Sequence, residues 1–228
     1  MPSFYPKTSA KLISILEEYG IGVVFDCCGK PVAELGLKIQ EEKIVTGIEN
    51  RLRKAGITEL IMACPNCYDF LKDRLKDINV IGIYEKLQKL GLGKEIEKDI
   101  SVFLPCPDRA KKELLSQIEP YVIGNLSPLE GTSCCGLGGC AAGKEPGLAK
   151  GMVMSLQETE FAEIYTYCAS CAGNLTRNLN TGNKEKVENK AVKKESKTVT
   201  HILTEILETY EKPDISSSFM NRVKTKFY

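Results

Sequence analysis

One arrangement of cysteines occurs twice in this 228-residue chain and constrains its fold more than any other feature. An adjacent pair followed by glycine, "DCCG" at 26–29 and "SCCG" at 133–136, precedes a Cys-x-x-Cys, "CPNC" at 64–67 and "CASC" at 168–171. The pair and the Cys-x-x-Cys are separated by 35 residues in the first copy and by 32 in the second. This repetition predicts two copies of one structural unit.

Each Cys-x-x-Cys stands between a short apolar run and a segment of helical pattern. The apolar runs are Leu60–Ala63 and Ile164–Tyr167. Further along each half, the pattern again changes from strand to helix, in "NVIGIYEKLQKL" and in "TVTHILTEILETY". Strands that alternate with helices predict parallel α/β units. We therefore expect an α/β protein of two Rossmann-like halves related by pseudo-two-fold symmetry, over residues 1–98 and 99–228.

The second half has an opening element that the first half lacks. The segment "ISVFLPCPDRAKKELLSQI" predicts a strand that ends at Cys106 and an amphipathic helix after it. Cys106 lies 28 residues before Cys134, and the same count back from Cys27 falls just outside the chain. The first half opens instead on "PSFYPKTSAKLISILEEYG", which matches the segment after Cys106. We expect the first half to lack its first strand and its first cysteine.

The composition indicates metal or redox chemistry. Ten cysteines are many for this length, and the first residues lack the basic, apolar and small-residue order of a signal peptide. We therefore expect a cytoplasmic protein, where abundant cysteine indicates metal binding or redox function rather than a disulfide framework. The longest apolar runs are far shorter than the about 20 residues of a membrane helix. A net charge of +1 gives no basic surface for nucleic acid.

The paired cysteines suit a centre with several metal atoms. Adjacent Cα atoms are about 3.8 Å apart, whereas disulfides span roughly 4.4–6.8 Å. The carboxyl ends of parallel strands meet at one edge of a sheet, where a helix N-terminus also stabilises a thiolate. A lone cysteine, a pair and a Cys-x-x-Cys would bring five sulfurs to that edge, more than the four that a zinc ion takes. Gly29 and Gly136 would let the backbone turn with positive φ beside it.

The doubled order of Cys, Cys-Cys-Gly and Cys-x-x-Cys resembles the cysteine-rich CCG domain of heterodisulfide reductase. Related iron–sulfur oxidoreductase subunits of glycolate and lactate oxidation share this domain. The phrases that carry the resemblance are "DCCGKPVAELG", "MACPNCYDFL", "TSCCGLGG" and "TYCASCAGNL". The resemblance implies a 4Fe–4S cluster in each complete motif, of a non-cubane type in some members. It also implies electron transfer from a flavin- or ferredoxin-type partner subunit to a disulfide or another two-electron acceptor.

Transferred onto this chain, the resemblance implies two sets of ligands. The second site is complete and consists of Cys106, Cys134, Cys135, Cys168 and Cys171, with Gly136 beside it. The first site is one ligand short and consists of Cys27, Cys28, Cys64 and Cys67. A start of the sequence placed too late would explain the missing ligand. The alternatives are a four-ligand centre, either 4Fe–4S or zinc, and an empty degenerate site. The alternative function is a non-catalytic zinc- or cluster-binding scaffold or docking subunit.

Other notable residues have ordinary structural interpretations. Cys140 belongs to neither copy and is interpreted as a packed thiol rather than an extra ligand. His201 is expected to be hydrogen-bonded at a strand-to-helix junction rather than to donate protons, and Tyr165 and Tyr167 to pack in the core. Residues 181–198 are charged and almost without apolar content, which predicts a solvated loop. The phrase "GLGGCAAG" is a weak match to a nucleotide-binding loop, because no strand precedes it.

Overall fold

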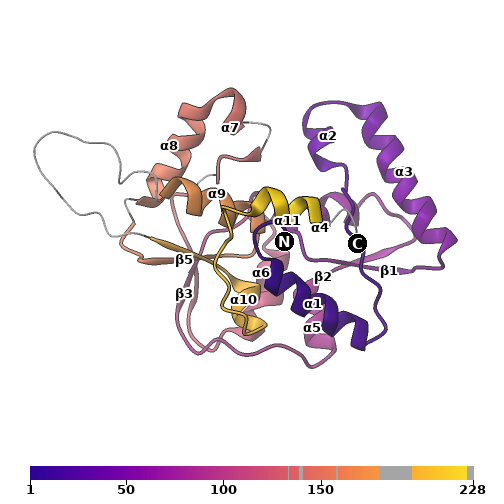
Figure 1. The fold of residues 1–228 in the computed structure, drawn as a ribbon, viewed down its shortest axis with the longest axis horizontal. Helices are drawn as coiled ribbons and strands as arrows, with labels where there is room; N and C mark the ends of the chain where they lie inside the picture. Colours follow the sequence, from indigo (N-terminus) through magenta and orange to yellow (C-terminus); the bar gives the residue numbers. More distant parts are fainter. Residues whose placement is uncertain (133, 139–140, 158, 180–196, 225–228) are drawn as a thin grey trace, which may run out of the picture.

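The computed structural model of the protein describes residues 1–132, 134–138, 141–157, 159–179 and 197–224. Helices and parallel strands alternate along most of the chain (Figure 1). In chain order, the elements of the predicted first half are α1 (Pro6–Glu18), α2 (Lys30–Glu34), α3 (Lys38–Lys54), β1 (Glu59–Met62), α4 (Pro65–Lys72), β2 (Asn79–Gly82) and α5 (Ile83–Lys89).

The predicted second half contains four strands. Its elements are β3 (Ile100–Val102), the 3-10 turn η1 (Cys106–Asp108), α6 (Glu113–Ile118), the 3-10 turn η2 (Glu119–Tyr121), β4 (Leu126–Pro128), α7 (Ala141–Lys144), α8 (Pro146–Gln157), β5 (Glu163–Thr166), α9 (Ala169–Leu179), β6 (Thr198–His201), α10 (Ile202–Ile206) and α11 (Ser218–Lys224). Among the helices described, none combines the length and the apolar character that a bilayer crossing requires.

The strands form two parallel sheets, which confirms the α/β class. β1 and β2 make a two-stranded sheet, and β4, β3, β5 and β6 make a four-stranded sheet in that order. The unit of strand, Cys-x-x-Cys, helix, strand and helix occurs once in each half, as β1-α4-β2-α5 and β5-α9-β6-α10. The two halves therefore share one local architecture, as the repeated cysteines predict.

The first sheet lacks the strand that the repeat predicts to be missing. In the second sheet β3 lies between β4 and β5, whereas β1 pairs with β2 and no strand occurs within residues 1–58. The apolar run before the first cysteine pair also forms no strand, and its side chains Val23, Val24 and Phe25 are exposed. A strand needs a neighbour for its backbone hydrogen bonds. Without a counterpart of β3, this run has no strand to pair with.

The predicted strand into Cys106 is shorter than expected. β3 ends at Val102, residues 106–108 form the turn η1, and the regular helix α6 begins only at Glu113. Pro105 and Pro107 explain the correction, because proline has no backbone N–H to donate to a ladder or a helix. Cys106 is therefore presented on a tight turn beyond the strand.

One cluster of buried apolar side chains joins the two halves. From α5, Ile83, Tyr84 and Leu87 belong to the same buried cluster as side chains of β3, α6 and α10. Leu12 and Leu16 of α1 pack into this cluster as well. Burial of this apolar surface holds the first and the second half together.

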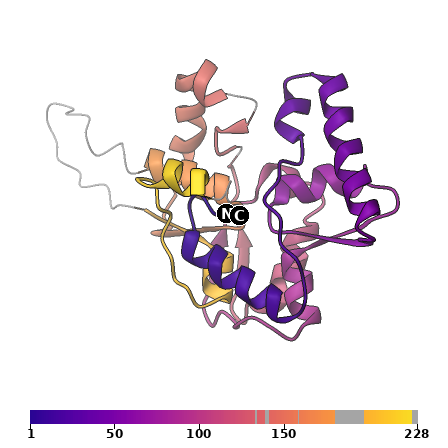
Figure 2. The ribbon, with the colours of Figure 1, turned by 45° about the vertical axis from the view of Figure 1, so that its right-hand side comes forward.

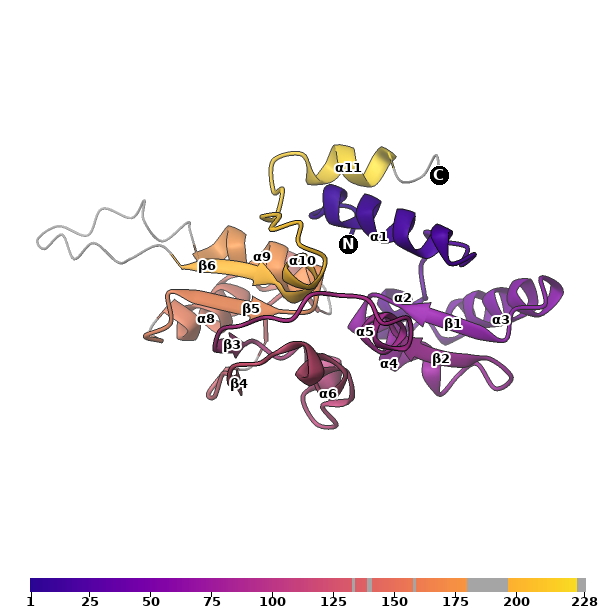
Figure 3. The same ribbon diagram turned by 90° about the horizontal axis from the view of Figure 1, so that it is seen from below.

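The start of the chain is bound to its end. The backbone N–H and the hydroxyl of Thr8 donate to the carboxylate of Glu211, and the side-chain amide of Asn221 donates to the carbonyl of Ser3. In Figure 2 the helix α11 (yellow) lies beside the helix α1 (indigo), and Figure 3 shows both on the same side of the two sheets. The boundary at residue 98 stays a prediction, since α1 contacts segments from both predicted halves.

Candidate metal centre

The second set of cysteines lies at one edge of the four-stranded sheet. Cys106 follows β3, the adjacent pair follows β4, and Cys168 and Cys171 follow β5 at the beginning of α9. These three strands are neighbours and parallel, so their carboxyl ends bring the three segments together. The predicted convergence of separated segments is therefore what the structure shows.

The five thiols of this second site are linked from one to the next by their mutual interactions. Cys106 Sγ lies 3.7 Å from Cys134 Sγ. Cys135 interacts with Cys134 and Cys171, and Cys171 interacts in turn with Cys168. Cys135, Cys168 and Cys171 are buried, whereas Cys106 is exposed. The site is thus closed on the side of α9 and open on the side of Cys106.

Hydrogen bonds between the thiols divide the protons of the second site unequally. The hydrogen bond from Cys171 lowers the pKa of Cys135 to about 7, so this thiol ionises near neutrality. Burial, followed by the charge of Cys134, raises the pKa of Cys106 to about 11. The pKa of Cys171 is raised by its hydrogen bonds to Cys135 and Cys168. Since metal ligation needs thiolates, binding at this site would displace protons.

Glycine after each cysteine pair has the predicted positive φ. Gly136 has φ of 80°, and a Cβ at this position would stand 2.8 Å from the carbonyl oxygen of Ala149. Its backbone N–H donates to Cys134 Sγ over 3.3 Å. Gly29 has φ of 90° beside the side chain of Ile44. Only glycine combines this backbone conformation with such close packing.

Three of the four cysteines of the first site lie together. Cys67 interacts with Cys28 and with Cys64, which begins α4 as its N-cap residue. The interaction with Cys67 is the largest cause that lowers the pKa of Cys28 to about 7 and that of Cys64 to about 6, and the pKa of Cys67 is raised. Cys27 is exposed. Its predicted role as a ligand stays a prediction.

A family model described as a cysteine-rich domain, CCG, matches residues 1–72 and 101–176. The chain belongs to the CCG cysteine-rich domain family. Each matched range contains one full set of the cysteines described above, so the internal repeat is also a repeat of this domain. A comparison with curated proteins gives no match.

The donor set of the two CCG repeats fits a metal or a metal cluster. It consists of thiols alone, which are soft ligands that favour zinc and iron–sulfur centres. Several of the thiols ionise near neutrality, as ligation requires. Among the described residues, no three His, Cys, Asp or Glu side chains are placed to hold a metal ion as they stand.

The two CCG sites lie close to each other. The side-chain amide of Asn66, between Cys64 and Cys67, donates to Cys168 Sγ over 3.9 Å. The buried amino group of Met1 interacts with a cysteine of each site. Burial lowers its pKa, whereas the charges of Cys64 and Cys168 raise this pKa. Neither the Asn66 amide nor the Met1 amino group was predicted from the sequence. The available sequence signal for the proximity of the two sites was that both Cys-x-x-Cys motifs follow equivalent strands.

Buried polar residues that were not predicted from the sequence fix the second site. Asn174 of α9 donates its side-chain amide to the carbonyl of Cys135 over 2.5 Å. Tyr167 Oη donates to Asp108 Oδ2 over 2.6 Å, and the same carboxylate accepts from the backbone N–H groups of Leu114 and Leu115 at the start of α6. The turn that carries Cys106 is therefore attached to both β5 and α6.

The remaining residues singled out in the sequence have structural roles where they are described. His201 is buried, its Nδ1 accepts from the backbone N–H of Leu203 over 3.3 Å, and burial lowers its pKa to about 3. Tyr165 and Tyr167 are buried in the core, as expected. Cys140 lies outside the described residues, as do positions 181–196 of the charged segment.

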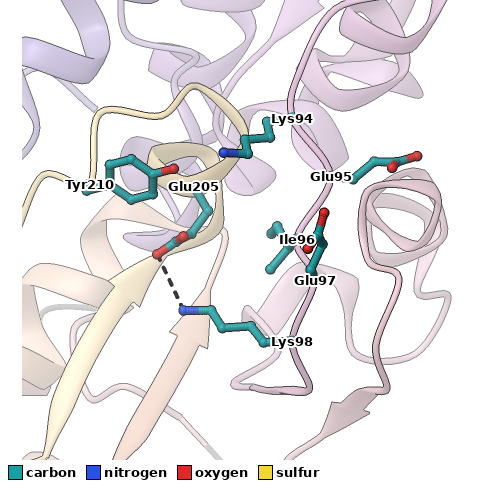
Figure 4. A pocket seen from close by; sticks show the side chains of 7 residues that line it. All are labelled: Lys94, Glu95, Ile96, Glu97, Lys98, Glu205 and Tyr210. Carbon is teal, nitrogen blue, oxygen red and sulfur yellow. Dashed lines mark ion pairs between the residues drawn. The ribbon is translucent and has the colours of Figure 1, made fainter.

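A separate pocket beside the four-stranded sheet contains no cysteine. It lies beside the amino end of β3 and is lined by Lys94, Glu95, Ile96, Glu97, Lys98, Glu205 and Tyr210 (Figure 4). Both lysines are paired with carboxylates: Lys94 with Glu208 over 3.1 Å, and Lys98 with Glu205 over 3.8 Å. Because its cations are already neutralised, this pocket adds no anion site to the CCG centres.

Proposed function

We propose that this CCG protein is an iron–sulfur oxidoreductase subunit similar to the CCG-domain subunit of heterodisulfide reductase, with a 4Fe–4S cluster in its second site. The observation that carries the proposal is the convergence of five thiols, from the segments that follow β3, β4 and β5, at the carboxyl edge of one sheet. A single zinc ion takes four ligands, whereas a centre with several metal atoms can use five thiolates, two of them on adjacent residues.

The residues of the second site divide the work of holding such a cluster. Cys135, Cys168 and Cys171 would ligate from the buried side, where water has no access. Gly136 brings the backbone close, and its N–H donates to the sulfur of Cys134. Hydrogen bonds to ligand sulfurs and burial are two of the means by which a protein sets the reduction potential of a cluster. When bound, the cluster would supply the capacity to accept and donate electrons.

Cys106 stands on the open side of the site, where an acceptor could approach. It is exposed and lies on a turn between two prolines. Reduction of a disulfide consumes two electrons and two protons and releases two thiols. In this proposal the electrons come from a partner protein of flavin or ferredoxin type, and the disulfide is a small molecule or another two-electron acceptor of similar chemistry.

The first site supports the alternative of a non-catalytic scaffold. Cys67 interacts with Cys28 and Cys64, whereas Cys27 is exposed. Three or four thiolates could hold zinc or a structural cluster, and a chain filled in this way would dock partners rather than turn over a substrate. Metal analysis distinguishes three states of this first site: a 4Fe–4S cluster, zinc or no metal.

A turnover experiment tests the oxidoreductase assignment. The anaerobically purified, cluster-loaded protein is supplied with reduced methyl viologen and a small aliphatic disulfide, and released thiols are counted. We expect two viologen radicals to be oxidised for each disulfide, and the Cys135→Ala/Cys171→Ala double variant to be inactive. A loaded protein that oxidises no viologen and releases no thiol would contradict catalysis and favour the scaffold.

A further inference from the structure

We propose that Asn66 is a positioning residue that couples the two cysteine sites, because it lies between two cysteines of the first site and donates a hydrogen bond to a thiol of the second. Its side-chain amide donates to Cys168 Sγ over 3.9 Å. Its backbone lies between Cys64 and Cys67, in the first turn of α4. The proposal rests on the proposed function in one respect: it gains its redox consequence when the thiols ligate a cluster.

The position of Asn66 allows it to sense both sites. It lies in the first turn of α4, inside the Cys-x-x-Cys of the first repeat, and Cys168 is 102 residues away in the second repeat. Cys168 is only 1% exposed, so solvent does not compete for its sulfur. A movement of the Cys64–Cys67 loop, such as loading of the first site would cause, must therefore change the bond to Cys168.

The bond would become stronger if Cys168 were a ligand of a cluster, because its sulfur would then carry negative charge. A neutral thiol is a weak acceptor, which agrees with the long distance of 3.9 Å. A hydrogen bond to a charged acceptor is shorter and roughly twice as strong as one between neutral groups. An amide donor on a ligand sulfur stabilises the more negative, reduced form of a cluster and so raises its reduction potential.

The second repeat has a different residue at the equivalent position. Ser170 occupies the matching position, two residues after Cys168, and it is exposed. Asn66 of the first repeat therefore contributes a donor to the second site. By linkage, anything that changes the second site through Asn66 changes the first by the same free energy.

Two substitutions that each keep the side-chain size close to the original test the proposal. Asn66→Leu keeps the volume and the backbone N–H but removes the side-chain donor, and Ser170→Ala is the matched control. For each loaded protein, iron and sulfide contents are measured and the midpoint potential of the second-site cluster is followed by a paramagnetic-resonance redox titration. We expect Asn66→Leu to lower this potential at unchanged iron content, and Ser170→Ala to leave it unchanged. An unchanged potential in Asn66→Leu overturns the proposal.

The apoprotein gives a readout that needs no cluster. In a nitrogen-15-labelled chain, the side-chain amide signal of Asn66 is identified by its loss in Asn66→Leu, and its shift is compared between the wild type and Cys168→Ala. We expect Cys168→Ala to move this signal and Cys106→Ala to leave it in place. A signal that is indifferent to Cys168 overturns the proposal even if the protein binds iron. If the wild type binds no iron, only the proposed function is contradicted. The shift of the amide signal still decides whether Asn66 contacts Cys168.

Discussion

Cys106 Sγ lies 3.7 Å from Cys134 Sγ, although 28 residues separate the two cysteines in the chain. Cys106 is exposed and Cys134 is half-exposed, so this pair forms the accessible end of the chain of thiols. Their contact joins the turn after β3 to the loop after β4. We therefore expect oxidation of the second site to begin at this contact.

We expect diamide to form a disulfide between Cys106 and Cys134 in the apoprotein. The two thiols lose two electrons and two protons, which convert diamide into the corresponding hydrazine. Cys168 and Cys171 are buried and should react more slowly. Peptide mapping after alkylation identifies the linked pair, and a reductant should restore the capacity to take up iron. A first disulfide that instead involves Cys27 would contradict the assigned contact.

Gly136→Ala should destabilise the protein and impair the second site. The positive φ and the carbonyl of Ala149 at 2.8 Å from the added Cβ make the substitution strained. We expect a loss of about 1–3 kcal/mol in the free energy of unfolding, measured with urea. Gly138→Ala is the control, because its Cβ would meet no atom within 4 Å. Equal stability of the two variants would show that Gly136 is not held as described.

Tyr167→Phe should loosen the turn that carries Cys106. Its hydroxyl donates to the buried carboxylate of Asp108 over 2.6 Å, and a hydrogen bond to a charged group contributes about 1.5–3 kcal/mol. Tyr84→Phe is a matched control, because the buried hydroxyl of Tyr84 has no hydrogen-bond partner among the described residues. Urea unfolding should therefore separate the two variants, and a larger loss in Tyr84→Phe would be the contrary result.

Metal uptake by the apoprotein should weaken as the pH falls. Cys135, with a pKa of about 7, and Cys106, with a pKa of about 11, must both be thiolates to ligate, so protons compete with the metal. Acid therefore opposes binding, and the apparent affinity should fall about tenfold per pH unit for each proton displaced. Anaerobic titration with Co²⁺, followed by the sulfur-to-cobalt charge-transfer band, measures this. An affinity that is constant between about pH 6 and pH 8 would be inconsistent with thiolate ligation.

Much of the fold could be predicted from the positions of apolar runs relative to the cysteines. The runs at Leu60–Ala63 and Ile164–Tyr167 overlap β1 and β5 with an offset of one residue, because a short apolar run before a Cys-x-x-Cys and a helix has few alternatives. The run Val23–Phe25 shows the limit of such patterns. Its composition favours a strand, but a strand forms only where another strand accepts its hydrogen bonds.

The grouping of the five second-site thiols was predictable, whereas their polar surroundings were not. Parallel strands bring their carboxyl ends together, and this topology places Cys106 near Cys134 without knowledge of any side chain. The bond from Asn66 to Cys168 depends on how the two halves pack together, and the bond from Tyr167 to Asp108 depends on how the turn η1 packs beside the end of β5. The sequence contains no local signal for either of these two hydrogen bonds.

The metal content of the second site tests the central proposal most directly. Iron, acid-labile sulfide and zinc are measured per chain in the anaerobically purified wild type and in the Cys135→Ala/Cys171→Ala double variant. The proposal predicts that the double variant loses about four irons and about four sulfides relative to the wild type. Zinc alone in the wild type, or the same iron content in both proteins, would contradict a cluster held by these five thiols.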